Sequence, residues 1–258
     1  MAFPNILQLQ YGDEKVTGLT KIYPLGQRAE TPDGKAYRYA RASATAIVAG
    51  KLYQGKAGEA NTAQINDLAP AGTVSAGDRT LDVTIAGTAL GSDVFNDGTL
   101  FVASSVGTGI GHTYKVKSAS SAAAGSTSTV TLEGNEQITV ALESGTTTVG
   151  LRKNKYDEVL LSTANTVRVN ALAGVSAASA AASAYVWLQT RGEAAVFTDN
   201  TTLIIGLPCT ASTTVAGAVG GNSAATTLNS NAIGYTKVGQ VVSVAGSAEY
   251  SLIDLSIE

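Results

Sequence analysis

Residues 184–196, AYVWLQTRGEAAV, constrain the fold more than any other stretch of the chain. The side chains alternate in two sets, with Tyr185, Trp187 and Gln189 in one and Val186, Leu188 and Thr190 in the other. Because successive side chains of a strand point to opposite faces, this pattern predicts a β-strand with both faces covered. Arg191-Gly192-Glu193 predicts a turn, after which residues 194–197 return as the next strand.

Length and charge set the class of protein. At 258 residues, the chain can form one large or two medium domains. Hydrophobic residues make up 44% of it and charged residues only 14%, with a formal net charge of −3. So weak a charge gives no broad attraction for nucleic acid or acidic membranes. A chain with few charges is typical of an extended β structure or of a surface that neighbouring molecules cover.

The cysteine count and the lengths of the apolar runs limit which disulfides, secretory signals and membrane spans the chain can have. Cys209 is the single cysteine, so the fold cannot depend on an intrachain disulfide, and we expect its side chain to be small and buried. The start of the chain lacks a basic leader followed by an apolar core, so we expect no secretory signal. No run approaches the roughly 20 apolar residues of a membrane span. These features predict a soluble protein.

Residues 1–23 show little alternation. Apolar residues are spread along a polar segment that contains turns: Phe3, Ile6, Leu7, Leu9 and Tyr11. One interpretation is a frayed terminus. The other is an arm, residues 2–19, whose apolar side chains dock on another chain.

A hairpin is predicted next. Pro32-Asp33-Gly34 is a tight-turn signal, because proline presets φ and glycine tolerates positive φ. In the following strand, residues 35–41, we expect Tyr37 and Tyr39 on one face and Arg38 and Arg41 opposite them. Such a set resembles a nucleic-acid platform, but contact with a protein neighbour is the favoured interpretation, since Arg and Tyr are enriched at interfaces. A turn at residues 49–51 leads into a strand at 52–54.

The middle of the chain predicts a self-contained series of short strands. They are separated by turns rich in Gly, Ser and Asn and lie at residues 80–85, 99–102, 114–117, 130–132, 138–142 and 149–151. This spacing favours a sandwich or a small barrel. We therefore expect an all-β protein: an arm at 1–23, a β-barrel or sandwich domain formed by 24–71 and 151–258, and an inserted β-rich domain at 72–150.

The C-terminal part predicts further strands at residues 166–170, 202–205, 234–238, 240–244 and 250–257. Alanine favours a helix at 177–184, but serines interrupt it and no apolar stripe appears, so we expect a loop over 171–184. In the last strand, Ile253, Leu255 and Ile257 share a face, and we expect this strand to pair into a sheet.

No catalytic, cofactor or metal site is predicted. His112 is the only histidine, which argues against the common zinc ligand sets and the Ser-His-Asp triad and favours a structural hydrogen bond. The glycines of residues 107–111 lack the rest of a phosphate-binding motif and predict a turn between strands. The oxygen-bearing residues of 93–98 lack the spacing of a calcium loop and predict a turn capped by Asx side chains.

Several short motifs, in order along most of the chain, resemble the capsid decoration or cement proteins of tailed phages. They are LGQRA at 25–29, DGKAYRY at 33–39, VAG at 48–50, DG at 97–98, GIGHTYKV at 109–116, VAL at 140–142, WLQTRG at 187–192, IGY at 233–235 and EYSL at 249–252. The alanine-rich residues 171–184 depart from the pattern. None of the motifs is chemically diagnostic.

This resemblance implies a mainly β structural protein of the virion, bound to the outer surface of the phage capsid and commonly trimeric. The implied partners are the major capsid protein and further copies of the chain, with no nucleic acid, membrane or cofactor. The implied contacts lie in the arm and the hairpin, at Phe3, Ile6, Leu7, Leu9, Tyr11, Tyr37, Arg38, Tyr39 and Arg41. The alternatives are a head fibre or tail protein that binds a host surface and, from another class, a carbohydrate-active enzyme, for which no pair of carboxylates is nominated.

Overall fold

The protein is all-β. A computed structural model describes residues 6–56, 66–164, 170–199, 201–221, 236–246 and 248–258. Within these ranges the only helical element is one short 3₁₀ turn, η1 (Asp13–Lys15). The chain divides into two compact units: a main unit up to Lys56 and from Lys155 onward, and a middle unit from Ala57 to Asn154. The middle unit is thus wider than the 72–150 expected from the sequence.

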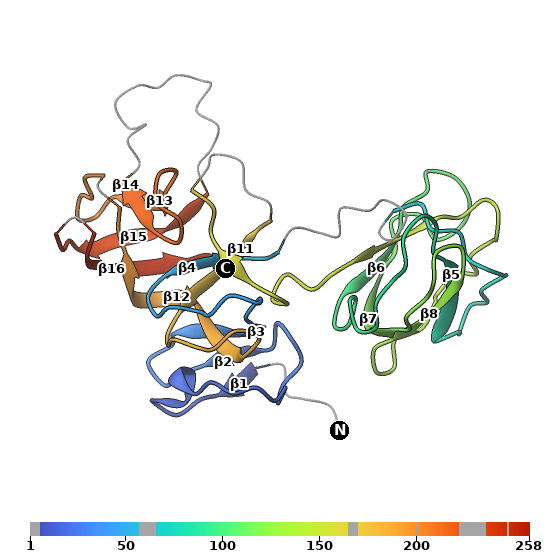
Figure 1. Cartoon of the computed structure of the whole chain (residues 1–258), viewed down its shortest axis with the longest axis horizontal. Helices are drawn as coiled ribbons and strands as arrows, with labels where there is room; N and C mark the ends of the chain where they lie inside the picture. The colour runs from blue at the N-terminus through green and yellow to red at the C-terminus, as the bar shows by residue number, and fades with distance from the viewer. Residues whose placement is uncertain (1–5, 57–65, 165–169, 200, 222–235, 247) are drawn as a thin grey trace, which may run out of the picture. The chain divides into compact units, whose positions relative to one another are not determined.

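The main unit is one sheet built from strands at both ends of the chain (Figure 1). Its strands are β1 (Ile6–Gln8), β2 (Arg28–Glu30), β3 (Ala36–Arg41), β4 (Leu52–Gln54), β10 (Leu160–Leu161), β11 (Leu172–Ser176), β12 (Tyr185–Phe197), β13 (Pro208–Ala211), β14 (Val219–Gly221), β15 (Lys237–Ser243) and β16 (Tyr250–Ser256). The path runs β1-β2-β3-β12-β16-β15-β13-β14, with β11, β4 and β10 branching from β12.

Strand β12 is the centre of this sheet. The prediction of a turn at residues 191–193 is wrong. The strand continues through Gly192 to Phe197. Its first half pairs with β3 and its second half with β16, and the register with β3 shifts between Gln189 and Arg191. Gly192 adopts a φ of 86°, which a glycine tolerates without strain. A bulge between Gln189 and Arg191 therefore stands just before the residues where the sequence indicated a turn, and bulges bend a strand without ending it.

Two apolar cores lie in the main unit, and β4 and β11 contribute to both. Tyr53 and Ala173 belong to the core that contains Trp187, whereas Leu52 and Val175 belong to the core of β13, β15 and β16. Alternation along a strand buried on both faces produces this division, because neighbouring residues point into different layers. Every residue of β4 and β11 is accordingly buried.

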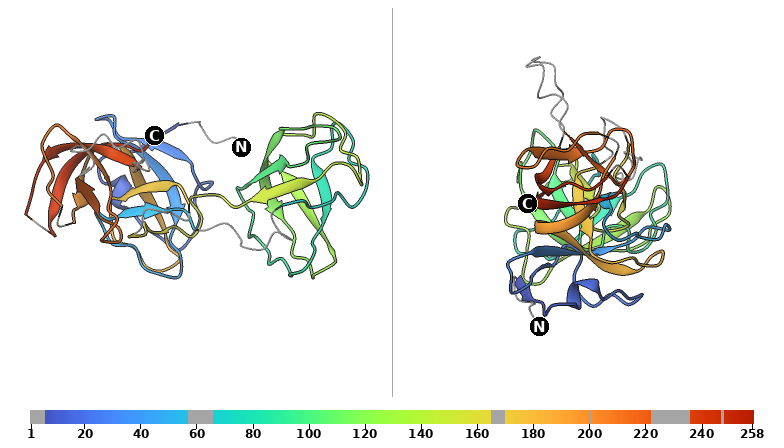
Figure 2. Two further views of the ribbon diagram at one scale, coloured as in Figure 1. Left: turned by 90° about the horizontal axis from the view of Figure 1, so that it is seen from above. Right: turned by 90° about the vertical axis from the view of Figure 1, so that its left-hand side faces the viewer.

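The middle unit is a five-stranded antiparallel sheet. Its strands are β5 (Thr80–Thr84), β6 (Thr99–Val102), β7 (Thr113–Ala119), β8 (Thr127–Leu132) and β9 (Val149–Arg152), in the order β5-β8-β7-β6-β9. The segment that follows Asp67 joins both edge strands. Leu68 bridges Val149 of β9, and the N–H of Thr84 in β5 donates to the Ala69 carbonyl at 3.0 Å. These contacts link both edge strands to one segment, and the sheet curves around a buried apolar core (Figure 2).

Several other expectations are confirmed. The hairpin forms between β2 and β3, with Gly34 at a φ of 81°, and β4 follows the turn at Gly50. Strand β16 pairs with β12 and β15, and Ile253 and Leu255 are buried together. Residues 177–184 form a loop that contains no helix.

Other expectations are wrong or fall outside the described residues. Residues 138–142 form no strand, because Leu142 makes only an isolated bridge to Val74. Residues 202–205 lead into a turn and are not a strand. Strand β11 begins within the stretch expected to be a loop. Of the strands expected at 166–170 and 234–238, residues 166–169 and 234–235 lie outside the described ranges.

Candidate interaction surface

A cluster of aromatic rings lies on one face of the β3–β12 pair. Tyr39 and Trp187 are directly opposite in register, with ring centroids 5.0 Å apart. Tyr185 stacks on Tyr39 at 5.5 Å, and Tyr23 packs edge-on against Tyr39 at 5.3 Å. Aromatic pairs at this spacing stabilise a fold beyond the area they bury. The cluster therefore forms a rigid apolar surface under the residues that pack on it.

Residues 9–22 form a segment that lies over this cluster; we call it the N-terminal segment. Its first residue is held by a bond from the Leu9 N–H to the Glu30 carbonyl at 2.8 Å. Its middle is held by paired backbone bonds between Gly18 and Tyr185, at 3.2 and 2.7 Å. At its end, the Ile22 N–H donates to the Tyr39 hydroxyl at 3.2 Å. The segment is thus fixed to the sheet, and the expectation of a frayed terminus is wrong for these residues.

The N-terminal segment exposes apolar side chains to solvent. Tyr11, Val16, Leu19 and Ile22 are 62–72% exposed although they lie within twelve residues of each other (68%, 64%, 72% and 62%). Between the segment and the aromatic cluster lies a cavity of about 250 Å³, the aromatic cleft, lined by Val16, Ile22, Tyr23, Tyr39, Tyr185 and Trp187 among others. A concentration of exposed apolar groups beside a cleft of this kind makes the segment a candidate interaction site.

The predicted contact residues of the arm differ in their exposure to solvent. Ile6 is half-exposed on β1 and Tyr11 is exposed, so both remain available to a partner. Leu7 packs partly against the main-unit core, and Leu9 is buried in it. Leu9 is covered by the core of its own chain, and its contact with another chain stays a prediction. Phe3 lies outside the described residues.

The predicted contact residues of the hairpin serve the fold instead. Tyr37 and Tyr39 are buried in the core of the chain, and burial is the main cause that raises the pKa of Tyr37 to about 12. The Arg38 Nε donates to Glu258 at 2.7 Å, and the Arg41 Nε donates to Asp157 at 2.6 Å. Within the single chain both tyrosines belong to the core, and Tyr39 also lines the aromatic cleft, so their contact with a partner stays a prediction.

The expected placement of the two arginines is also corrected in part. Arg41 shares the register parity of Tyr39, and the residue opposite it is Tyr185. Residues two apart on a strand point the same way, so Arg41 lies on the tyrosine face and only Arg38 lies opposite. This placement of Arg41 follows from the sequence alone, because Arg41 lies two residues after Tyr39.

The sequence did not single out Val16 and Ile22. Isolated apolar residues among polar ones carry no period and so give no strand or helix signal. What makes them notable is the pairing of Gly18 with Tyr185, a contact between residues far apart in the chain. That pairing fixes the segment while leaving these side chains outside.

The remaining candidate sites have structural roles. The His112 Nδ1 lies 3.1 Å from the Tyr114 hydroxyl and 3.0 Å from the Thr139 hydroxyl, as the expected structural hydrogen bond. Gly107, Gly109 and Gly111 all adopt positive φ in a turn between β6 and β7. The Asn96 amide donates to Asp93 at 2.7 Å within a turn. Cys209 is buried, and burial raises the pKa of its thiol to about 11.

Two features of the described ranges bear on metal binding and on membranes. In that part of the chain, no group of three or more His, Cys, Asp or Glu side chains gathers where it could hold a metal ion. The same residues include no helix with the length and apolar character that a membrane crossing requires.

Comparison with known proteins adds no relative: no family model, no curated protein and no solved structure matches the chain.

Proposed function

We propose that this protein decorates the outer surface of a tailed-phage capsid, as a homotrimer that cements neighbouring capsid subunits and stabilises the mature head. The observation that carries the proposal is the N-terminal segment, which presents Tyr11 and Leu19 to solvent while backbone bonds hold it in place. The resemblance of the sequence motifs to phage decoration proteins names the partner. This role requires binding surface and no catalytic group.

A fixed apolar segment suits a binding role on energetic grounds. Burying apolar surface contributes about 25 cal/mol per Å², but ordering a flexible segment at the same time would offset part of that gain. The bonds at Leu9, Gly18 and Ile22 order this segment before any partner arrives. Its exposed side chains can therefore contribute most of their burial to affinity.

Repetition would raise that affinity further. A trimer placed on a symmetric shell engages several equivalent sites, and each contact after the first is effectively intramolecular. A protein that binds the mature shell more tightly than the immature one shifts the equilibrium between them toward the mature form. Stabilisation of the head follows from that difference in affinity.

The test uses phage heads that lack the protein. The purified chain is added back, and bound protein is measured by co-sedimentation with the heads. We expect the wild type to bind in many copies per head and Leu19→Asp to bind at least tenfold more weakly, because it places a charge in an apolar contact. Val106→Asp is the matched control, since Val106 is exposed to a similar degree (63%) but belongs to the middle unit.

Two results would count against the proposal. Failure of the wild type to sediment with heads would remove the capsid as partner. Binding in a few copies at the tail would favour a fibre or tail protein that recognises a host surface.

A further inference from the structure

A second apolar feature of the main unit is a turn, residues 204–207, which we call the apolar turn. The Leu207 N–H donates to the Ile204 carbonyl at 3.1 Å, and Gly206 has a φ of 84°. Ile204, Ile205 and Leu207 are 56%, 65% and 45% exposed. Turns are ordinarily made of Gly, Pro, Asn, Asp and Ser. Two exposed isoleucines at the tip of a turn therefore need a reason outside local structure.

The apolar turn is held rigidly beside β15. The Gly206 N–H donates to the Val241 carbonyl at 2.8 Å, and the Val241 N–H donates to the Leu207 carbonyl at 3.0 Å. The Gln240 side-chain amide also donates to the Gly206 carbonyl, at 2.6 Å. The turn thus displays its isoleucines in one fixed arrangement, which lowers the entropy cost of binding them.

The aromatic cleft is complementary to this turn. It offers about 250 Å³ lined largely by rings and by Val16 and Ile22, a volume sufficient for the side chains of one or two isoleucines. The turn and its flanks, residues 202–208, carry no charged side chain that would have to lose its water on entry. The turn is apolar, and the cleft is mostly apolar, with Asp13, Thr17 and Thr20 also in its lining. Both features are preformed and open to solvent.

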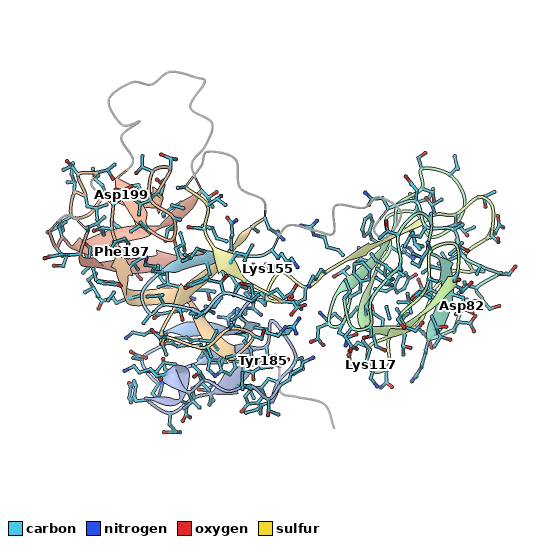
Figure 3. All side chains as sticks on the ribbon, in the orientation of Figure 1. Asp82, Lys117, Lys155, Tyr185, Phe197 and Asp199 are labelled. Atoms are coloured by element: carbon cyan, nitrogen blue, oxygen red, sulfur yellow. The ribbon has the colours of Figure 1, made fainter. Side chains whose placement is uncertain are left out.

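One copy of the chain cannot bring the two features together. Val241 lies opposite Ile253 of β16, and Ile253 lies opposite Ala194 of β12. The cleft is at Trp187, seven residues earlier on the same strand, which corresponds to roughly 20–25 Å at about 3.3 Å per residue. Figure 3 labels Tyr185 and Phe197, which mark the two ends of β12, the cleft lying at the Tyr185 end.

We propose that the apolar turn of one copy inserts into the aromatic cleft of a second copy, so that the chain assembles head to tail. The two partner surfaces differ, and such a heterologous contact closes into a ring when its rotation allows. The inference deepens the proposed function and rests on it for the closed trimer. Its test uses no capsid, so the two proposals can fail separately.

The experiment is sedimentation velocity on the full-length protein and three variants. Ile205→Asp changes the turn but keeps the cleft, whereas Val16→Asp changes the rim of the cleft but keeps the turn. Both positions are largely exposed, so both variants are expected to fold, which a circular dichroism spectrum like that of the wild type would verify. Val106→Asp in the middle unit is the control for an added charge at an exposed valine.

We expect the wild type and the control to sediment as a closed oligomer, and each of the other two variants as a monomer. An equimolar mixture of Ile205→Asp and Val16→Asp has one intact joint, from the turn of the second to the cleft of the first. The mixture should therefore form a dimer, which neither variant forms alone.

The proposal is overturned if the wild type is a monomer, or if both variants keep its oligomeric mass. It is equally overturned if the mixture stays monomeric, since an interface made of one self-complementary surface would give that result.

Discussion

At the scale of single residues, the side chain of Glu258 ties together distant parts of the main unit. Its carboxylate accepts from the Arg38 Nε at 2.7 Å and from the Tyr156 hydroxyl at 2.6 Å, with Lys155 at 3.7 Å. Burial alone would raise its pKa, but the bonds from Tyr156 and Arg38 and the charges of Arg38 and Lys155 outweigh burial and lower it. The folded state therefore favours the ionised form.

Glu258→Gln is expected to lower the free energy of unfolding by about 1–2 kcal/mol at neutral pH, because it weakens charge-assisted bonds. A lowered pKa contributes stability that is present above the unfolded pKa, about 4.3 for glutamate, and that is lost as pH falls through the folded value. The difference between wild type and variant should thus shrink below about pH 4. Urea titrations followed by Trp187 fluorescence at several pH values measure it.

The control for this variant is Glu133→Gln, an exposed glutamate of the middle unit. It should leave the transition unchanged at every pH. A Glu258→Gln effect that grew on acidification would contradict the assigned ion pairs.

A second residue-scale prediction concerns Gly50. It adopts a φ of 71°, and a Cβ there would lie 2.5 Å from the Tyr250 ring and 3.1 Å from the Ala195 carbonyl. Gly50→Ala should destabilise the main unit by about 2–4 kcal/mol, because strain and a clash add. Gly34→Ala is the matched control: its φ is 81°, but its Cβ meets nothing within 4 Å, so about 1 kcal/mol is expected. Equal losses in denaturant titrations would refute the steric argument.

At the scale of elements, alternation along the sequence was sufficient to predict most of the strands that form. It predicted the hairpin, β4, β16 and the strands of the middle unit. In a half-buried strand, apolar and polar residues alternate along the sequence because they point to opposite faces. It failed at residues 191–193, which continue β12 in regular register with β16, directly after a bulge between Gln189 and Arg191. Whether a bulge or a turn forms is decided by β16, a strand far away in the chain.

The candidate surface was predictable only in part. The sequence pointed to the arm as a stretch of unpatterned apolar residues, and Tyr11 is exposed in it, but its contact with a partner stays a prediction. The burial of Leu9 and the exposure of Leu19 depend on how the segment pairs with Glu30 and Tyr185. The apolar turn was mistaken for a strand, because Leu-Ile-Ile has the composition of one.

At the scale of the molecule, the two units have separate cores and should unfold with separate energetics. Leu100 is buried in the core of the middle unit, whereas Trp187, the single tryptophan, belongs to the main unit. Leu100→Ala should destabilise the middle unit by about 2–5 kcal/mol through lost burial and a cavity. It should leave the unfolding transition seen by Trp187 fluorescence in place while shifting part of the transition seen by circular dichroism.

Leu188→Ala is the reciprocal variant, since Leu188 is fully buried beside Trp187. It should shift the Trp187 transition. If Leu100→Ala moves the fluorescence transition by the same amount, the units form one cooperative structure and the division of the molecule is wrong.

At the same scale, we propose that the protein works by binding the outer surface of the capsid. A density map of the intact phage head tests this claim most directly. The proposal predicts copies of this chain on the outer surface of the shell, at joints between capsid subunits, with the N-terminal segment against capsid protein. A head surface without the chain, or density for it at the tail alone, would contradict it.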